Sequence, residues 1–177
     1  TPQREVAEEL GALLGARAIL LADESGDSPF DEACSRPWLQ LQQRFASLPI
    51  PLACFATTVE LRGENDTSHD FARHDAEALV GFLRRRGVLR ADEQPLPAAR
   101  CKATPLAGSE PVTAPGPGVV IFHVEAGEEV QAGAAIADLV DVHSGEVQTL
   151  RCQSAGLVYA RSGSRWASPG QRLAKIA

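Results

Sequence analysis

The sequence lacks the features that mark membrane proteins, nucleic-acid-binding proteins and proteins with a visible export signal. No apolar run approaches the ~20 residues that a helix needs to cross a bilayer. No basic segment followed by an apolar one opens the chain as a signal peptide would. The formal net charge is −6, without a basic stripe, so neither nucleic acid nor a membrane is expected as a partner. The first residue is Thr1 rather than Met, which indicates a processed protein or a fragment.

Short motifs for zinc knuckles, nucleotide binding and serine hydrolysis are also absent. The sequence has no GxxxxGK[ST] phosphate loop, no GxGxxG after a strand and no GxSxG elbow. The four cysteines are too scattered to form CxxC pairs, and free thiols in a reducing cytoplasm are therefore expected. These cysteines are Cys34, Cys54, Cys101 and Cys152.

Residues 1–90 alternate helical and strand-like patterns, as α/β domains do. Residues 52–59 are apolar on both faces, which predicts an inner strand of a parallel sheet with both faces covered. Acidic and turn-forming residues predict a loop over residues 23–31. The other predicted elements are a first helix ending at Gly15, a strand over 18–21, a second helix opened by Pro37 and a third helix capped within 66–68 and ended by Gly87.

This half of the chain has too few strands for the fold that its pattern indicates. A sheet covered on both faces usually has about four to six strands, and only two are predicted here. We therefore expect the missing strands to come from upstream sequence or from another chain. Residues 1–90 are then an α/β fragment, the C-terminal part of a larger α/β domain.

Residues 91–111 contain four prolines and no periodic pattern, which predicts a linker. From residue 112 onward, short apolar segments alternate with glycine turns and repeat with an offset of 36 to 38 residues. A chain that repeats one strand–turn–strand unit in this way can form two interlocked sheets related by a pseudo-twofold axis.

A specific motif accompanies this repeat. Ala114-Pro115 precedes Gly118-Val119-Val120, and glycines punctuate the turns of residues 127–137. In this pattern the second half resembles the biotinyl/lipoyl-type barrel-sandwich hybrid, or hammerhead. Carriers of that type modify a lysine at the hairpin between the half-repeats, here near residues 141–146, which contain none. The lysines of the chain are Lys102 and Lys175, so a carrier role is not expected.

The first half carries a second resemblance. Residues 58–62, Thr-Val-Glu-Leu-Arg, resemble the T-[VI]-E-[LF]-R strand end of zinc carboxypeptidases. With the β domain that follows, the chain is similar to the succinylglutamate desuccinylase/aspartoacylase family, in which a peptidase-like domain precedes a C-terminal β domain. The resemblance implies the C-terminal part of a zinc carboxypeptidase-like α/β domain over 1–90, a linker over 91–111 and an all-β barrel-sandwich domain over 112–177.

The family resemblance implies a zinc-dependent deacylase. In that family an HxxE pair and a distant histidine hold Zn²⁺, and a glutamate takes a proton from the metal-bound water. Glu60 matches this general base, and its place after an apolar strand is typical of sites in α/β folds. Arg62 is expected to pair with Glu60 or to bind a substrate carboxylate, and a surface ion pair is an equal alternative.

The metal ligands of that family have no counterpart in the sequence. No HxxE occurs, and His69 and His74 are five residues apart rather than the four that place two ligands on one helix face. His123 and His143 lie singly in the β half and are expected to be structural. We therefore expect the zinc ligands in upstream sequence and expect these 177 residues alone to be inactive.

Two functions of different classes follow from these patterns. The leading one is the C-terminal portion of a deacylase that cleaves N-acyl amino acids or similar small amides in the cytoplasm. The alternative is a non-catalytic binding or oligomerisation module with a hammerhead domain, in which Glu60 is a relic. The expected partner is a small N-acyl amino acid-like substrate, and homo-oligomerisation is left open.

Overall fold

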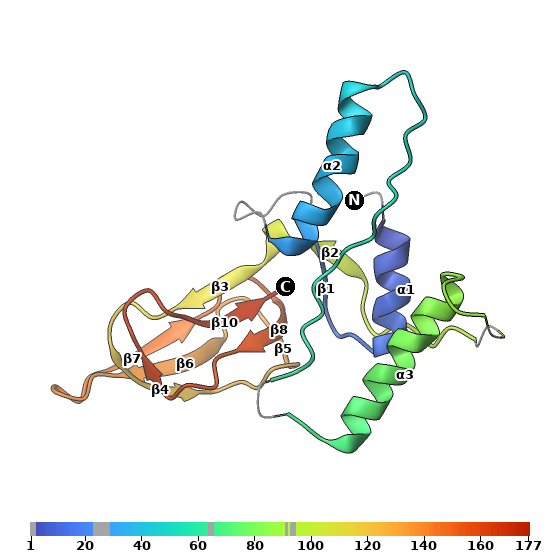
Figure 1. Ribbon diagram of the computed structural model, residues 1–177. Coiled ribbons are helices and arrows are strands. Elements are labelled where there is room, and N and C mark those ends of the chain that lie inside the picture. The colour runs from blue at the N-terminus through green and yellow to red at the C-terminus, as the bar shows by residue number, and fades with distance from the viewer. Residues whose placement is uncertain (1–2, 23–28, 64–65, 91, 93–94) are drawn as a thin grey trace. The chain divides into compact units, whose positions relative to one another are not determined.

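The computed structural model describes residues 3–22, 29–63, 66–90, 92 and 95–177. The chain divides into two compact units, Thr1–Ala103 and Thr104–Ala177. Helices dominate the described part of the first unit, and antiparallel strands make up most of the second (Figure 1). No helix within the described residues is long and apolar enough to span a bilayer.

Helices α1 (Arg4–Leu14) and α3 (His69–Arg85) pack together in the first unit. Gly15 ends α1 in the left-handed conformation, with φ of 66°, as the sequence predicts. The Glu9 carboxylate of α1 accepts a hydrogen bond from Arg85 Nε at 2.5 Å. This ion pair ties the middle of α1 to the last turn of α3. The sequence also predicts that this helix opens at Thr1-Pro2, and these two residues lie outside the described ones.

Helix α3 begins where its cap was predicted. The Ser68 hydroxyl accepts a hydrogen bond from the Phe71 backbone N–H at 3.1 Å, and Gly87 follows the last turn with φ of 71°. The apolar spacing of residues 71, 78, 79, 82 and 83 predicts a buried face on this helix, and the structure covers that face only in part. Ala78 is buried and Phe82 contacts Phe55, whereas Phe71, Leu79 and Leu83 remain exposed.

Helix α2 (Phe30–Arg44) begins seven residues earlier than the opening predicted at Pro37. Pro37 lies inside the helix, where its ring removes one backbone donor. Asp31 and Glu32 occupy the first turn and suit the positive end of the helix dipole, which favours the earlier start. Residues 30–31 of the predicted loop are thus helical, and residues 23–28 of it lie outside the described residues.

The predicted inner strand over residues 52–59 is wrong, because these residues have no regular secondary structure. A strand requires a neighbour that exchanges backbone hydrogen bonds with it, and no described segment provides one here. The short strand predicted over 18–21 is present as β1 (Ile19–Leu21). It forms a two-stranded sheet with β2 (Ala103–Pro105).

The second unit contains two four-stranded sheets and a short 3-10 helix (Leu106–Gly108). The strand orders are β3-β10-β8-β5 and β7-β6-β4-β9, and the pairs described are antiparallel. The strands are β3 (Glu110–Thr113), β4 (Gly118–Phe122), β5 (Glu129–Val130), β6 (Ala135–Val140), β7 (Val147–Arg151), β8 (Gly156–Arg161), β9 (Trp166–Ala167) and β10 (Arg172–Ile176).

The sequence repeat organises these sheets. The offset seen in the sequence relates β3 to β7, β4 to β8, β5 to β9 and β6 to β10, and this exchange converts one strand order into the other. The predicted pair of interlocked sheets is therefore present. The buried core repeats in the same way. Val120 and Val158 occupy equivalent positions of the two repeats, as do Ile136 and Leu173, and all four are buried.

Candidate functional site

Glu60 lies in the irregular segment between α2 and α3. Its side chain is exposed, and it has no hydrogen bond or ion pair with any described residue. Its neighbours Val59 and Leu61 are also exposed, at 39% and 47%. The expectation that Glu60 stands at the edge of a sheet is not met within the described residues, because residues 52–59 form no strand.

The chain before Glu60 is held by side chains rather than by a sheet. Gln3 Nε2 donates to the Cys54 carbonyl oxygen at 2.9 Å. The Thr58 hydroxyl donates to Asp31 Oδ2 at 3.0 Å, close to the start of α2. Thr58 is two residues from Glu60, so this contact fixes the backbone just before the candidate base.

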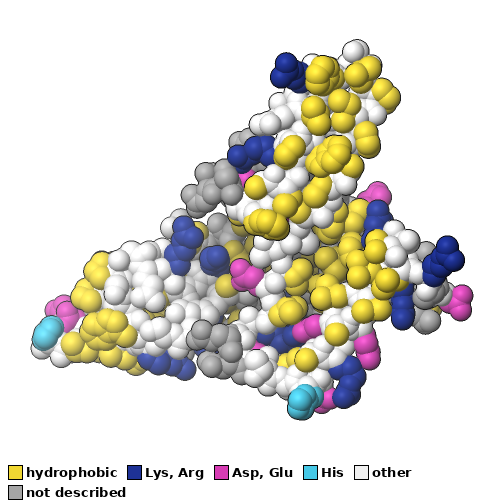
Figure 2. Space-filling model, in the orientation of Figure 1, with side chains coloured by type: hydrophobic (Ala, Val, Ile, Leu, Met, Phe, Trp, Pro, Cys, Tyr) yellow, Lys and Arg dark blue, Asp and Glu magenta, His cyan; other side chains and the backbone are white. Residues whose placement is uncertain are grey.

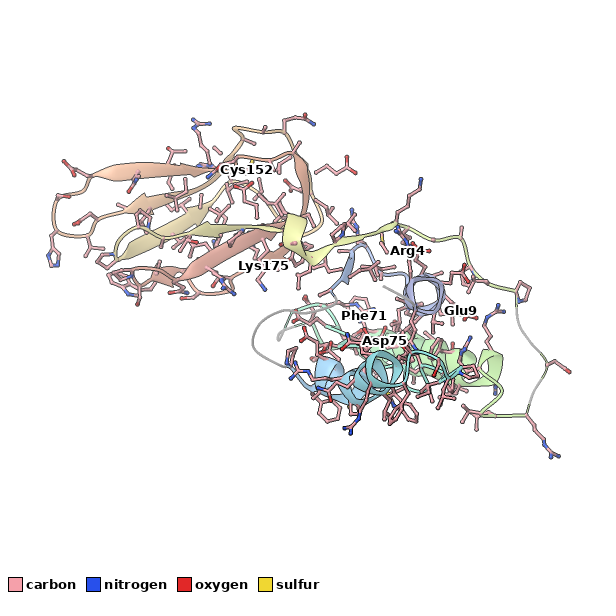
Figure 3. All side chains as sticks on the ribbon, turned by 90° about the horizontal axis from the view of Figure 1, so that it is seen from above. Arg4, Glu9, Phe71, Asp75, Cys152 and Lys175 are labelled. Carbon is pink, nitrogen blue, oxygen red and sulfur yellow. The ribbon has the colours of Figure 1, made fainter. Side chains whose placement is uncertain are left out.

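The chain after Glu60 is held by Arg62. Arg62 Nη1 and Nη2 donate to the two carboxylate oxygens of Asp75 on α3, at 2.6 and 3.0 Å. The Arg62 guanidinium also lies over the Phe71 ring, 4.2 Å from its centroid. Figure 3 shows Phe71 and Asp75 close together on α3. Hydrogen bonds from Arg62 hold the pKa of Asp75 below its usual range, and the same bonds raise the pKa of Arg62.

Arg62 thus forms an ion pair with Asp75 and not with Glu60. Of the three roles expected for Arg62, the pair with Glu60 is absent, and an ion pair with another carboxylate is present. Asp75 was missed, although the sequence contains a signal for it. Asp75 shares a helix face with Phe71, Ala78 and Phe82, at spacings of three and four residues. A carboxylate on an apolar helix face needs a cationic partner when it is buried, and Asp75 is only 7% exposed.

The described residues do not fit a zinc site. Nowhere in the described ranges do three or more His, Cys, Asp or Glu side chains gather closely enough to hold a metal ion. His74 Nε2 lies 3.3 Å from the Leu14 carbonyl oxygen, and His123 Nε2 lies 3.0 Å from Asp138 Oδ2. His143 is exposed in the hairpin between β6 and β7. None of these histidines lies in a ligand set with Glu60.

The hairpin between β6 and β7 is built as a tight turn without a modifiable lysine. Asp141 Oδ1 accepts hydrogen bonds from the backbone N–H groups of His143 and Ser144, at 2.7 and 3.0 Å. Gly145 takes a positive φ of 74°. Lys175 lies on β10 (Figure 3) and not in this turn. The hairpin therefore offers no amine for biotin or lipoate.

Solved structures of other proteins match the fold of nearly the whole chain. A succinylglutamate desuccinylase/aspartoacylase family protein from Shewanella amazonensis SB2B matches 99% of the chain, with a TM-score of 0.79 and 24% identity. A succinylglutamate desuccinylase/aspartoacylase from Shewanella frigidimarina matches 97%, with a TM-score of 0.76 and 21% identity. The ectoine utilization protein EutE (DoeB) from Ruegeria pomeroyi matches 99%, with a TM-score of 0.72 and 17% identity.

The present chain spans about half the length of these proteins, at 48%, 48% and 51% of their chains. No protein-family model and no curated protein matches the sequence. At these identities the likeness establishes the fold. The chain therefore has the fold of the C-terminal half of succinylglutamate desuccinylase/aspartoacylase family proteins.

Proposed function

We propose that this chain is the C-terminal portion of a deacylase that hydrolyses N-acyl amino acids or similar small amides, with Glu60 as the general base. The observation that carries the proposal is a fold shared over 99% of the chain with desuccinylase/aspartoacylase family structures. It is supported by an exposed Glu60 carboxylate within the Thr58–Arg62 motif. The second unit is assigned to the barrel-sandwich hybrid type, on its repeat-related sheets.

Glu60 contributes proton transfer in this proposal. An attacking water gives a proton to the Glu60 carboxylate as its oxygen bonds to the acyl carbon. The C–N bond then breaks, and the same proton passes from Glu60 to the departing amine. Arg62 is kept as a candidate contact for a substrate carboxylate, although both of its terminal nitrogens donate to Asp75 here.

Zinc enters the proposal only through the family resemblance. Bound zinc would polarise the acyl oxygen and make a water more acidic. The described residues do not supply its ligands, so the proposal places these ligands outside the present sequence. It also places the protein in the cytoplasm, where the four free cysteines would stay reduced.

A non-catalytic binding or oligomerisation module is the second candidate. It is favoured by the apolar side chains left exposed on the first unit, which Figure 2 shows gathered along α2. No residue of α2 is buried, and Phe30, Leu41, Phe45 and Leu48 are exposed on it or just after it. Exposed patches of this kind mark surfaces that other polypeptide covers.

The test compares Glu60→Gln with wild type in the full-length protein, measuring amine release from a panel of N-acyl amino acids. Loss of a general base should lower turnover by about 100-fold or more, while zinc content per chain stays unchanged. Glu77→Gln, an exposed glutamate on α3, is the matched control and should keep full turnover. Near-normal turnover in Glu60→Gln would remove Glu60 from the reaction. Absence of turnover and of zinc in the wild type would favour the non-catalytic module.

A further inference from the structure

The backbone on both sides of Glu60 is held by helix carboxylates. Thr58, two residues before Glu60, donates to Asp31 near the start of α2, and Arg62, two residues after it, is gripped by Asp75 of α3. The predicted strand is missing, so no described sheet partner holds this segment. The direction of the Glu60 side chain therefore depends on these two anchors.

The anchor at Arg62 is the stronger of the two. Two parallel hydrogen bonds join its guanidinium to a carboxylate that is only 7% exposed, whereas Thr58 makes a single exposed bond. The guanidinium also lies over the ring of Phe71, one helical turn before Asp75. The two hydrogen bonds to Asp75 and the contact with the Phe71 ring together restrict rotation of the Arg62 side chain.

Arg62, which makes these contacts with Asp75 and Phe71, also has an unusual backbone conformation. Arg62 has φ of 62°, the left-handed region, and no other described non-glycine residue shares it. Such conformations persist where surrounding contacts over-determine them, and they gather at functional sites. The chain therefore bends at Arg62, two residues after Glu60. The contacts of Arg62 thus set the conformation that presents Glu60.

We infer that Asp75 is a positioning residue, which acts through Arg62 to hold the Glu60 carboxylate in place. The inference deepens the proposed function and rests on it. Asp75 does not touch the reacting atoms. Its removal should slow the chemical step without weakening substrate binding, whereas loss of a substrate contact by Arg62 would raise KM.

The experiment measures kcat and KM separately for Asp75→Asn, Arg62→Lys, Arg62→Ala and the double variant Arg62→Ala/Asp75→Asn in the full-length protein. Circular dichroism confirms folding of each variant. Amide hydrogen exchange over residues 58–63 reports the order of the segment independently of turnover. Asp70→Asn is the matched control, since Asp70 lies on the same helix, is 92% exposed and makes only a 3.7 Å ion pair with Arg73.

Asp75→Asn is expected to lower kcat by about 10-fold, with KM changed by less than about two-fold, because a small misplacement of a catalytic group costs rate. Amide hydrogen exchange over residues 58–63 should become faster in Asp75→Asn. The decrease in kcat should be smaller for Arg62→Lys than for Arg62→Ala. In the Arg62→Ala background, Asp75→Asn should cause no further loss of kcat.

Two results would overturn the inference and can be told apart. If Glu60→Gln is inactive while Asp75→Asn matches Asp70→Asn in kcat and in exchange, Glu60 is the base and Asp75 does not position it. If Glu60→Gln turns over normally, the proposed function itself fails, and the assignment of Asp75 fails with it.

Discussion

Two carboxylates of the first unit, fifteen residues apart in sequence, lie in opposite environments. Glu60 is exposed without a partner in the described structure, and Asp75 is buried with its two oxygens bonded to Arg62. A carboxylate that transfers protons must be accessible to water and substrate, whereas a carboxylate that positions another residue must keep its hydrogen bonds to that residue. The division of roles proposed here follows from that difference.

At the scale of single residues the second unit also contains a titratable contact, centred on Asp138. The Thr149 hydroxyl, at 2.7 Å, and the His123 ring hold the pKa of Asp138 below its usual range. The pKa in the folded protein is thus lower than in the unfolded chain. The carboxylate therefore stabilises the fold above the unfolded pKa of about 3.9, and this contribution is lost as the pH falls through the folded value.

We therefore expect Asp138→Asn to lower the thermal midpoint of the protein at pH 7 and to have little effect near pH 2. Thermal unfolding of wild type and variant, followed by circular dichroism between pH 2 and pH 7, measures the difference. If the difference in thermal midpoint between wild type and variant stayed constant from pH 2 to pH 7, it would contradict the role given to the Asp138 carboxylate.

At the scale of elements, local signals were sufficient for some segments and insufficient for others. In the sequence, Gly15 marks the end of α1, and Ser68 and Gly87 mark the two ends of α3. The repeat with its glycine turns predicts the two sheets of the second unit. Such signals act within a few residues or within one repeat. Residues 52–59 depend on a neighbour, so their apolar pattern predicted a strand that the described chain does not pair.

The repeat makes a paired prediction for two glycines. A Cβ atom on Gly118 would lie 2.6 Å from the Val140 carbonyl oxygen, and one on Gly156 would lie 2.5 Å from the equivalent oxygen of Ala177. Because backbone must shift in each case, Gly118→Ala and Gly156→Ala should each destabilise the protein by about 1–3 kcal/mol.

Gly116→Ala is the control, since nothing lies within 4 Å of a Cβ there. Urea denaturation of the three variants measures the free energies of unfolding. Equal stability of all three variants would mean that the close approach of these strands is not a constraint.

The candidate site shows the same limit of sequence reasoning. Glu60 could be chosen from a five-residue motif, but the partner of Arg62 lies on another element, thirteen residues away. Asp75 could have been found only by asking what a carboxylate does on an apolar helix face. A motif in the sequence can nominate a candidate catalytic group, whereas its contacts on other elements are found from the tertiary structure.

At the scale of the whole molecule, the two units differ in how they bury apolar surface. The second unit has a contiguous core that draws on both sheets, centred on Ile136, Val158 and Leu173. Few apolar residues of the described first unit are buried, among them Leu10, Ala12 and Ala78. Stability should therefore be concentrated in the second unit.

We expect a polypeptide of residues 104–177 to fold alone and to unfold cooperatively, because its core is its own. Heteronuclear NMR spectra would show dispersed amide resonances that coincide with those of the same residues in the longer protein. Collapsed, poorly dispersed spectra would show instead that the β unit depends on other parts of the chain.

The register of the second unit sets Ile176 opposite Glu110, so the first strand of its sheets lies beside the last. A module that begins and ends at one place can be carried at the end of a chain or inserted within a loop, and neither connection has to stretch across it. Such a unit can be moved between unrelated proteins during evolution, and its fold alone does not determine the activity of the protein that contains it.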